Sequence, residues 1–186
     1  MKNLALFDLN SINTIITPKY FEQLTINSNA LEVLTDFNFQ KAFVVSSEMV
    51  AEKALKSMLA AHVQMKIIVT EDDEFVGMIS TNELSERFIV AEVAKGHSRD
   101  EVLVKDLMIP REDLFAFDFE DLKHSSVKDV VNALKTNHLR HCLVIDSDEK
   151  HIRGVISASD IARKLQVPIA INDKASFSKL FDIIHS

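Results

Sequence analysis

Apolar and polar residues between positions 40 and 96 follow a sequence of strand-like and helix-like patterns. Ala42 to Val45, MKIIVT and EFVGMIS are short runs whose β-branched and aliphatic content is typical of strands. Between the first two runs, apolar residues recur at i, i+3, i+4 and i+7, which predicts one buried helix face. A second helix is predicted from near Thr81 through Ala91, ending at Gly96. The order predicts a β-α-β-β-α unit.

The same order returns after Pro110. Each residue of the first helix face has a counterpart 76 positions later, and the following strand and helix are displaced by 77 positions. One residue inserted in the second hairpin turn accounts for the difference. A period longer than those of solenoid repeats predicts two copies of one small unit. The pairs are Ala51 and Val127, Ala54 and Val130, Leu55 and Val131, Met58 and Leu134, His62 and His138, then Gly77 and Gly154, Ser80 and Ser157, Glu83 and Asp160.

The second copy contains a candidate anion site where its last strand meets its last helix. The strand HIRGVIS ends at Ser157, and helical spacing follows with Ile161 and Leu165. The first amides of such a helix have no partners within it and lie at the positive end of its dipole, which favours a phosphate. Asp160 in the first turn can accept hydrogen bonds from two ribose hydroxyls. The alternative interpretation is a capping box, because Ser-x-x-Asp stabilises a helix start without any ligand.

The stretch RHCLVID…IRGVISASDIARKL resembles the cystathionine beta-synthase (CBS) domain, whose β-α-β-β-α unit usually occurs as a tandem pair. The family signature, Gly-x-hydrophobic-Ser/Thr-x-x-Asp, is present as Gly154, Ile156, Ser157 and Asp160. The resemblance covers about residues 40 to 167. It implies an α+β fold, a tandem CBS pair in which helices pack on small sheets and pseudo-twofold symmetry leaves two clefts.

The first copy departs from the signature. Gly77, Ile79 and Ser80 match, but Glu83 stands where the family has Asp. Its carboxylate is one methylene farther from the backbone, and each charged hydrogen bond lost to a misplaced ligand would cost about 1.5–3 kcal/mol. The second copy has a departure of its own at Leu143, where the family's strand usually carries proline. We therefore expect Ser80 and Glu83 to form a weaker second site, or a plain capping box.

The resemblance also implies a ligand, because many such pairs bind adenosine nucleotides or adenosyl compounds in their clefts. AMP, ADP, ATP and S-adenosylmethionine are candidates as regulatory ligands, and no cofactor is required. Ser157 would hold phosphate and Asp160 the ribose, while Arg140 offers charge to a phosphate. Adenine would lie against apolar and backbone groups. The expected ligand-binding residues are Ser157, Asp160, Ser159, His141, Cys142, Met108, Ile109 and Arg140.

The pattern divides the chain into five segments. The predicted repeats span 39–96 and 111–167, and a linker, 97–110, joins them. Residues 1–38 form a lead-in with a short helix, and 168–186 form an amphipathic helix. The terminal helix is expected to pack on the domain or across a dimer, with a partner-binding role as the alternative.

Composition excludes several classes of function. The net charge is −7 without a dense Lys and Arg cluster, so nucleic acid is not expected as a partner. The N-terminus lacks a signal-peptide core, and no apolar run approaches the roughly 20 residues that span a bilayer. A single cysteine, Cys142, fits a reducing cytosol. We therefore expect a cytoplasmic protein that does not bind membranes.

A metal site and a nucleophilic enzyme are weaker alternatives. His138, His141, Cys142 and His151 are close in sequence, but His141 and Cys142 point to opposite faces of one strand, so no zinc site is expected. Nothing nearby supplies an oxyanion hole for a Cys–His pair, so a small hydrolase ranks third. The leading hypothesis is a non-catalytic regulatory module, a homodimer that acts on an unknown effector protein. The alternative is a structural dimerisation module without nucleotide.

Overall fold

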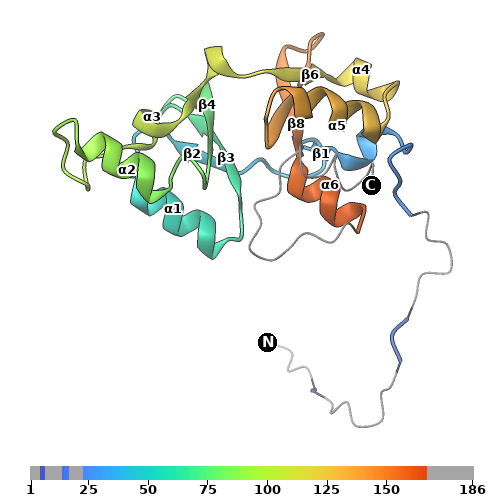
Figure 1. Cartoon of the computed structure of the whole chain (residues 1–186), viewed down its shortest axis with the longest axis horizontal. Coiled ribbons are helices and arrows are strands. Elements are labelled where there is room, and N and C mark those ends of the chain that lie inside the picture. The colour runs from blue at the N-terminus through green and yellow to red at the C-terminus, as the bar shows by residue number, and fades with distance from the viewer. Residues whose placement is uncertain (1–4, 7–13, 17–22, 167–186) are drawn as a thin grey trace.

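The computed structural model of the chain describes residues 5–6, 14–16 and 23–166. Two four-stranded sheets face each other, and each carries helices on its outer side (Figure 1). The first sheet has the order β2 (Val44–Ser46), β3 (Met65–Val69), β4 (Phe75–Ser80) and β5 (Ile109–Pro110), with α1 (Ala51–Ala60), α2 (Glu86–Val93) and α3 (Val104–Leu107). The second has the order β1 (Thr35–Asp36), β8 (His151–Ser157), β7 (His141–Asp146) and β6 (Ala116–Asp118), with η1 (Ala30–Val33), α4 (Phe119–Lys123), α5 (Val127–Thr136) and α6 (Ala158–Lys164). The short turn η2 (Arg111–Asp113), between β5 and β6, contacts β4 of the first sheet.

The two repeats share their strand pairing in detail. In each, the first strand runs parallel to the second, and the second and third form an antiparallel hairpin. The register shifts at Ile68/Val69 in one hairpin and at Val144/Ile145 in the other, 76 positions later. His62 and His138 both have φ of 53°, at the turn that follows the first helix of each repeat. The expected α+β fold with duplicated units is therefore confirmed.

A short strand from outside each repeat completes the sheet of the other repeat. β1 precedes the first repeat, yet pairs antiparallel with β8 of the second. β5 precedes the second repeat and pairs with β4 of the first. The signature glycines make this close approach possible, because a Cβ on Gly154 would overlap the carbonyl oxygen of Thr35, and one on Gly77 that of Ile109.

The strands divide their side chains between two kinds of core. One face of each sheet packs on its own helices, as with Ile68 and Ile79, which are fully buried under α1 and α2. The opposite faces meet between the repeats, where a buried cluster joins Ile67 and Met78 to Leu143 and Val155. These residues are related in pairs by the repeat, so the interface between the sheets is the pseudo-twofold contact that the resemblance implied.

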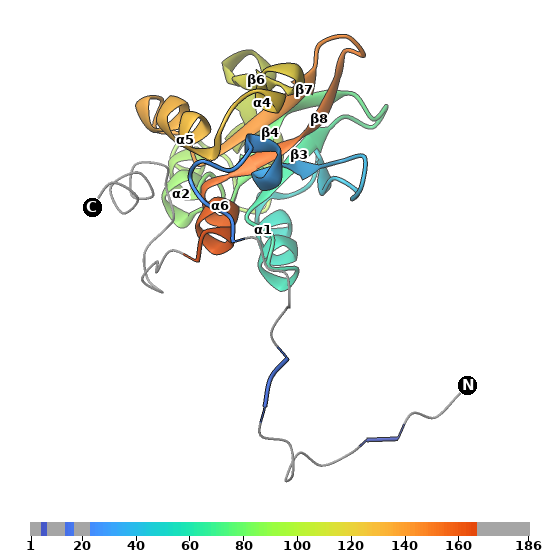
Figure 2. The ribbon, with the colours of Figure 1, turned by 90° about the vertical axis from the view of Figure 1, so that its right-hand side faces the viewer.

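Several details differ from the expectation. The second helix of the first repeat begins at Glu86 and not near Thr81, because residues 81–85 form turns. The lead-in and the linker were predicted to contain no strand, but the lead-in supplies β1 and the linker supplies β5. Figure 2 shows both hairpin turns on one side of the molecule and the ends of α1 and α6 on the other. The predicted helix over 168–186 lies outside the described residues. No helix among residues 23–166 is long and apolar enough to span a bilayer.

Candidate functional site

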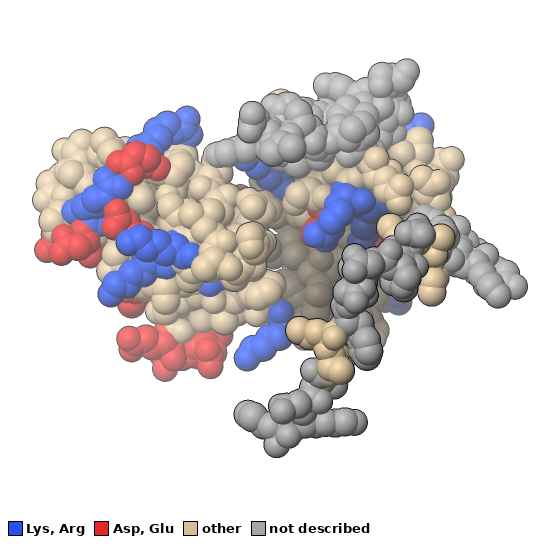
Figure 3. Space-filling model, turned by 90° about the horizontal axis from the view of Figure 1, so that it is seen from below, with Lys and Arg blue, Asp and Glu red and all other residues tan. Residues whose placement is uncertain are grey.

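A cavity of about 450 Å³ opens between the repeats, beside the start of α6. In the view from below, the molecule is hollowed between its two halves, with Lys and Arg side chains next to the hollow (Figure 3). The second repeat contributes β7, β8 and α6, and the first contributes the turn after α1. Among the residues that line it are Thr35, Phe37, Gln40, Lys41, His62, Ile67, His141, Val155, Ser157, Asp160 and Arg163, together with Ser159, one of the expected ligand-binding residues.

Asp160 lies at the wall of this cavity with its side chain 27% exposed. Ser157 Oγ donates to its Oδ2 at 2.7 Å and accepts from its backbone N–H at 3.1 Å. The Nη2 atom of Arg163 lies 2.6 Å from Oδ1, on a side chain that is 76% exposed. Ser157 thus caps the helix as the alternative interpretation expected, while the carboxylate of Asp160 faces the cavity. The cap and a ligand site use the same residues and do not exclude each other.

Glu83, the counterpart of Asp160, is folded back onto its own turn. Its Oε2 accepts from the backbone N–H of Ser80 at 2.9 Å and from Ser80 Oγ at 2.5 Å. Its Oε1 accepts from Asn82 Nδ2 at 2.9 Å. Burial raises the pKa of Glu83, but these hydrogen bonds outweigh burial and hold the pKa below its ordinary value. The longer side chain therefore satisfies its carboxylate locally, and both oxygens are occupied.

His141 lies at the start of β7, opposite Ser157 in the hairpin register, and lines the Asp160 cavity. Burial lowers the pKa of His141 to about 4, although the carboxylates of Glu83 and Asp160 act in the opposite direction. The imidazole is therefore neutral at pH 7. Both carboxylates act on His141 electrostatically, and in the Asp160 cavity its side chain is a neutral group able to form hydrogen bonds.

The other predicted site residues lie elsewhere. Cys142 points into the core of the second repeat, where its Sγ lies 3.5 Å from the Phe115 carbonyl oxygen, and burial raises its pKa to about 11. The backbone of Arg140 contacts the start of α6, where its carbonyl oxygen accepts a hydrogen bond from the Ala158 N–H at 3.0 Å. Met108 and Ile109 pack against β4 in the other sheet.

The residues that stand beside Asp160 instead come from β1 and the loop after it. Thr35 and Phe37 occupy the place that Met108 and Ile109 were expected to fill. The reason is that β1 pairs with β8 in the sheet of the second repeat, whereas β5 pairs with β4 in the sheet of the first. Gln40, Lys41 and His62 are further lining residues that sequence reasoning missed. All three lie inside the predicted first repeat, and the sequence pattern marks only His62, through its pairing with His138.

No metal site is evident in the described part of the chain. Within it, no group of three or more His, Cys, Asp or Glu side chains is arranged to hold a metal ion. His141 and Cys142 point to opposite faces of β7, as the strand geometry predicts.

Comparison with known proteins identifies the repeats. Residues 34–89 and 104–167 match the family model described as CBS domain. No curated protein matches the sequence. An uncharacterized conserved protein from Pyrococcus horikoshii has a similar structure, with a TM-score of 0.57 and 14% identity, covering 79% of this chain and 98% of that chain.

Two similar structures were determined with ligands. CBSX2 of Arabidopsis thaliana, in complex with AMP, has a TM-score of 0.52 and 19% identity, covering 75% of this chain and 98% of that chain. The CBS domain pair of protein MJ0100, in complex with 5′-methylthioadenosine and S-adenosyl-L-methionine, has a TM-score of 0.52 and 15% identity, covering 73% of this chain and 94% of that chain. At these identities the likeness establishes a common fold.

Proposed function

Because this chain belongs to the CBS domain family, we propose that it is a non-catalytic ligand-sensing module that binds an adenosine nucleotide or adenosyl compound. The observation that carries the proposal is the position of Asp160, whose partly exposed carboxylate lines a cavity of about 450 Å³ between the repeats. Cavities of this size bind small molecules in many proteins. The AMP and adenosyl ligands of the two similar structures support the same ligand class.

The cavity walls suit the parts of an adenosine compound. Asp160 would accept hydrogen bonds from the ribose hydroxyls, and Arg163 would give way, because an ion pair with a 76% exposed partner contributes only about 0–1 kcal/mol. Phe37 and Val155 supply apolar walls for the adenine. Lys41 and Ser157 would interact with a phosphate.

Charge distinguishes this cavity from its symmetry-related counterpart. Gln40 and Lys41 line the Asp160 cavity. Counted back along the chain from the equivalent strands β2 and β6, the residues at the same positions in the second repeat are Glu112 and Asp113. Two carboxylates would repel a phosphate from the Glu83 side, and Glu83 is itself satisfied by Ser80 and Asn82. We therefore propose one nucleotide per chain, with AMP as the first candidate because its single phosphate matches the few cations present.

Signalling would follow from the position of the ligand between the repeats. A compound that contacts Thr35 and His62 as well as Asp160 joins groups from different parts of the interface. It would bias the angle between the repeats, or the assembly of two chains, to the extent that its affinity differs between two such states. An effector protein that recognises one state is part of this proposal, as is a homodimer.

The test is a calorimetric and thermal-shift titration of the full chain with AMP, ADP, ATP and S-adenosylmethionine. A ligand at 100 times its Kd would raise the unfolding free energy by about 2.7 kcal/mol. We expect Asp160→Ala to abolish most of this rise and Glu83→Ala to leave the affinity unchanged. Absence of binding by the whole panel would reject the proposal in favour of a structural dimerisation module.

A further inference from the structure

A second cavity, of about 770 Å³, lies at the opposite end of the interface between the repeats. It is bounded by the start of β4 and by the β7–β8 turn, at the end of the molecule from which both hairpin turns project in Figure 2. Its walls are mainly apolar, with Phe75 and Leu114 facing Leu143 and Ile152, and Phe115 is 70% exposed beside them. A concave apolar surface of this size on a folded domain is typical of a ligand-binding groove.

The charged residues that line this cavity leave an excess of positive charge. Arg111 and Lys150 are exposed, and neither side chain makes an ion pair or hydrogen bond with the described part of the chain. Asp146 is the one carboxylate among the lining residues, and it lies 3.8 Å from Arg153. Two cations that have no partner among the described residues, beside apolar walls, complement a ligand that has an apolar body and one negative group.

We propose that this cavity binds a small apolar carboxylate, such as a medium-chain alkyl acid or an aryl acid. The apolar body lies between the two hairpins, where it removes Leu114 and Phe115 from water. The carboxylate pairs with Arg111 and Lys150 at the edge. The site is independent of the adenosine cavity in its chemistry, although Phe37 and Ile67 line both.

The test is a calorimetric titration of the full chain with sodium decanoate, below its micelle-forming concentration, and with 2-naphthoate. We expect saturable binding of one acid molecule per chain. Decylamine, which has the same apolar chain with the opposite charge, should bind at least tenfold more weakly. Arg111→Gln combined with Lys150→Gln should weaken decanoate binding at least tenfold.

A matched pair of charge variants controls for effects on the fold. Val44 lines the cavity and is 46% exposed, while Val90 on α2 is 49% exposed and lies outside it. Val44→Asp should abolish decanoate binding by repulsion, whereas Val90→Asp should leave it unchanged. Asp160→Ala should also leave it unchanged, which separates this site from the proposed adenosine site. Absence of saturable binding, equal binding of decylamine, or insensitivity to both Val44→Asp and the double variant would overturn the proposal.

Discussion

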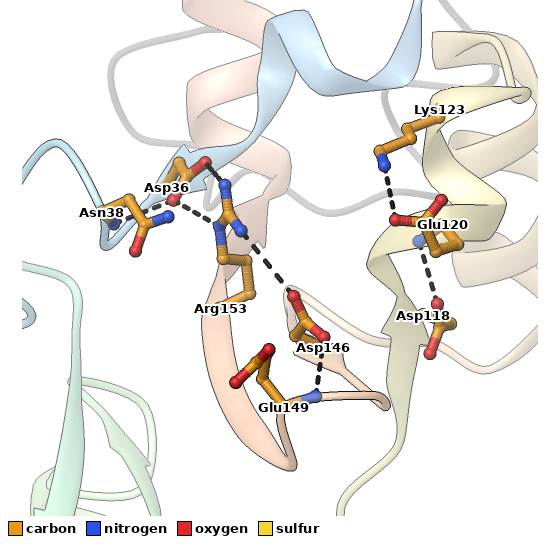
Figure 4. A network of polar contacts seen from close by, with 8 residues as sticks. All are labelled: Asp36, Asn38, Asp118, Glu120, Lys123, Asp146, Glu149 and Arg153. Atoms are coloured by element: carbon orange, nitrogen blue, oxygen red, sulfur yellow. Dashed lines mark hydrogen bonds and ion pairs between the residues drawn. The ribbon is translucent and has the colours of Figure 1, made fainter.

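Arg153 holds the carboxylate of Asp36 at two atoms, with Nε 2.8 Å from Oδ1 and Nη2 2.9 Å from Oδ2 (Figure 4). The pair fastens β1, which precedes the first repeat, to β8 of the second. Its side chains are only 17% and 14% exposed, and the guanidinium also lies 4.2 Å above the Phe119 ring. The hydrogen bonds from Arg153 hold the pKa of Asp36 below its ordinary value. The wall of the Asp160 cavity that contains Thr35 is thereby fixed.

Replacement of Arg153 by Met keeps an apolar stem and leaves the buried Asp36 carboxylate without its cation, with the backbone N–H of Asn38 still donating to it. We expect the free energy of unfolding to fall by about 3 kcal/mol, which urea denaturation would measure. The control is Lys105→Met, which breaks an ion pair with Glu48 whose two side chains are 44% and 47% exposed. This change should cost less than about 1 kcal/mol. Equal losses in the two variants would contradict the role given to Asp36.

The two signature glycines provide a test of the close pairing of β1 with β8 and of β5 with β4. Gly154→Ala places a methyl group against the Thr35 carbonyl oxygen, and Gly77→Ala places one against that of Ile109. Each should lower the unfolding free energy by about 1–3 kcal/mol, because backbone must move. Only Gly154→Ala displaces a wall of the Asp160 cavity, so it alone should weaken the proposed AMP binding. A calorimetric titration of both folded variants that gave equal AMP affinities would argue against this assignment.

Removal of the Glu83 carboxylate leaves the amide and hydroxyl of Ser80 without their acceptor. We expect Glu83→Ala to lower the unfolding free energy by about 1–3 kcal/mol, which denaturant titration would detect. Glu101→Ala is a suitable control, since Glu101 accepts from Ser98 Oγ at 2.6 Å on an exposed turn. Its effect should be smaller because water replaces the lost acceptor. A Glu83→Ala protein as stable as wild type would show that the folded-back carboxylate contributes nothing.

His141 makes the stability dependent on pH. Its pKa is about 4 in the folded chain and about 6.5 when unfolded, so the unfolded chain binds the proton first. The contribution of the neutral imidazole is complete above pH 6.5 and is lost as pH falls toward 4, by on the order of 3 kcal/mol. The difference between wild type and His141→Gln, measured by denaturation across this range, isolates the effect. A difference that stays constant with pH would refute it.

Cys142 is expected to be unreactive in the folded protein. Its side chain is 3% exposed, and burial raises the thiol pKa to about 11, so little thiolate forms at pH 8. An aromatic disulfide reagent should react with one thiol per chain after denaturation and much more slowly before it. Rapid labelling of the native chain would disprove the assigned burial. It would also reopen the nucleophile hypothesis.

The local patterns were sufficient to predict the repeated unit. The apolar face of α1 and the hairpins of β3–β4 and β7–β8 depend on residues close in sequence, so spacing alone predicts them. The start of α2 was predicted too early, because the bonds of Glu83 with Ser80 and Asn82 hold residues 81–85 in turns. Those bonds depend on the reach of one side chain, which a periodic pattern does not contain.

The sequence by itself determined that the chain is a duplicated β-α-β-β-α unit, and that its second copy has Ser157 and Asp160 at a helix start. Tertiary structure alone decided which groups face Asp160. β1 and β5 are two-residue strands that exchange between repeats, so Thr35 lies in the cavity while Ile109 lies in the other sheet. The pairing of β1 with β8 joins residues more than a hundred positions apart, such as Thr35 and Val155, and its energy comes from contacts that exist only once both sheets have formed.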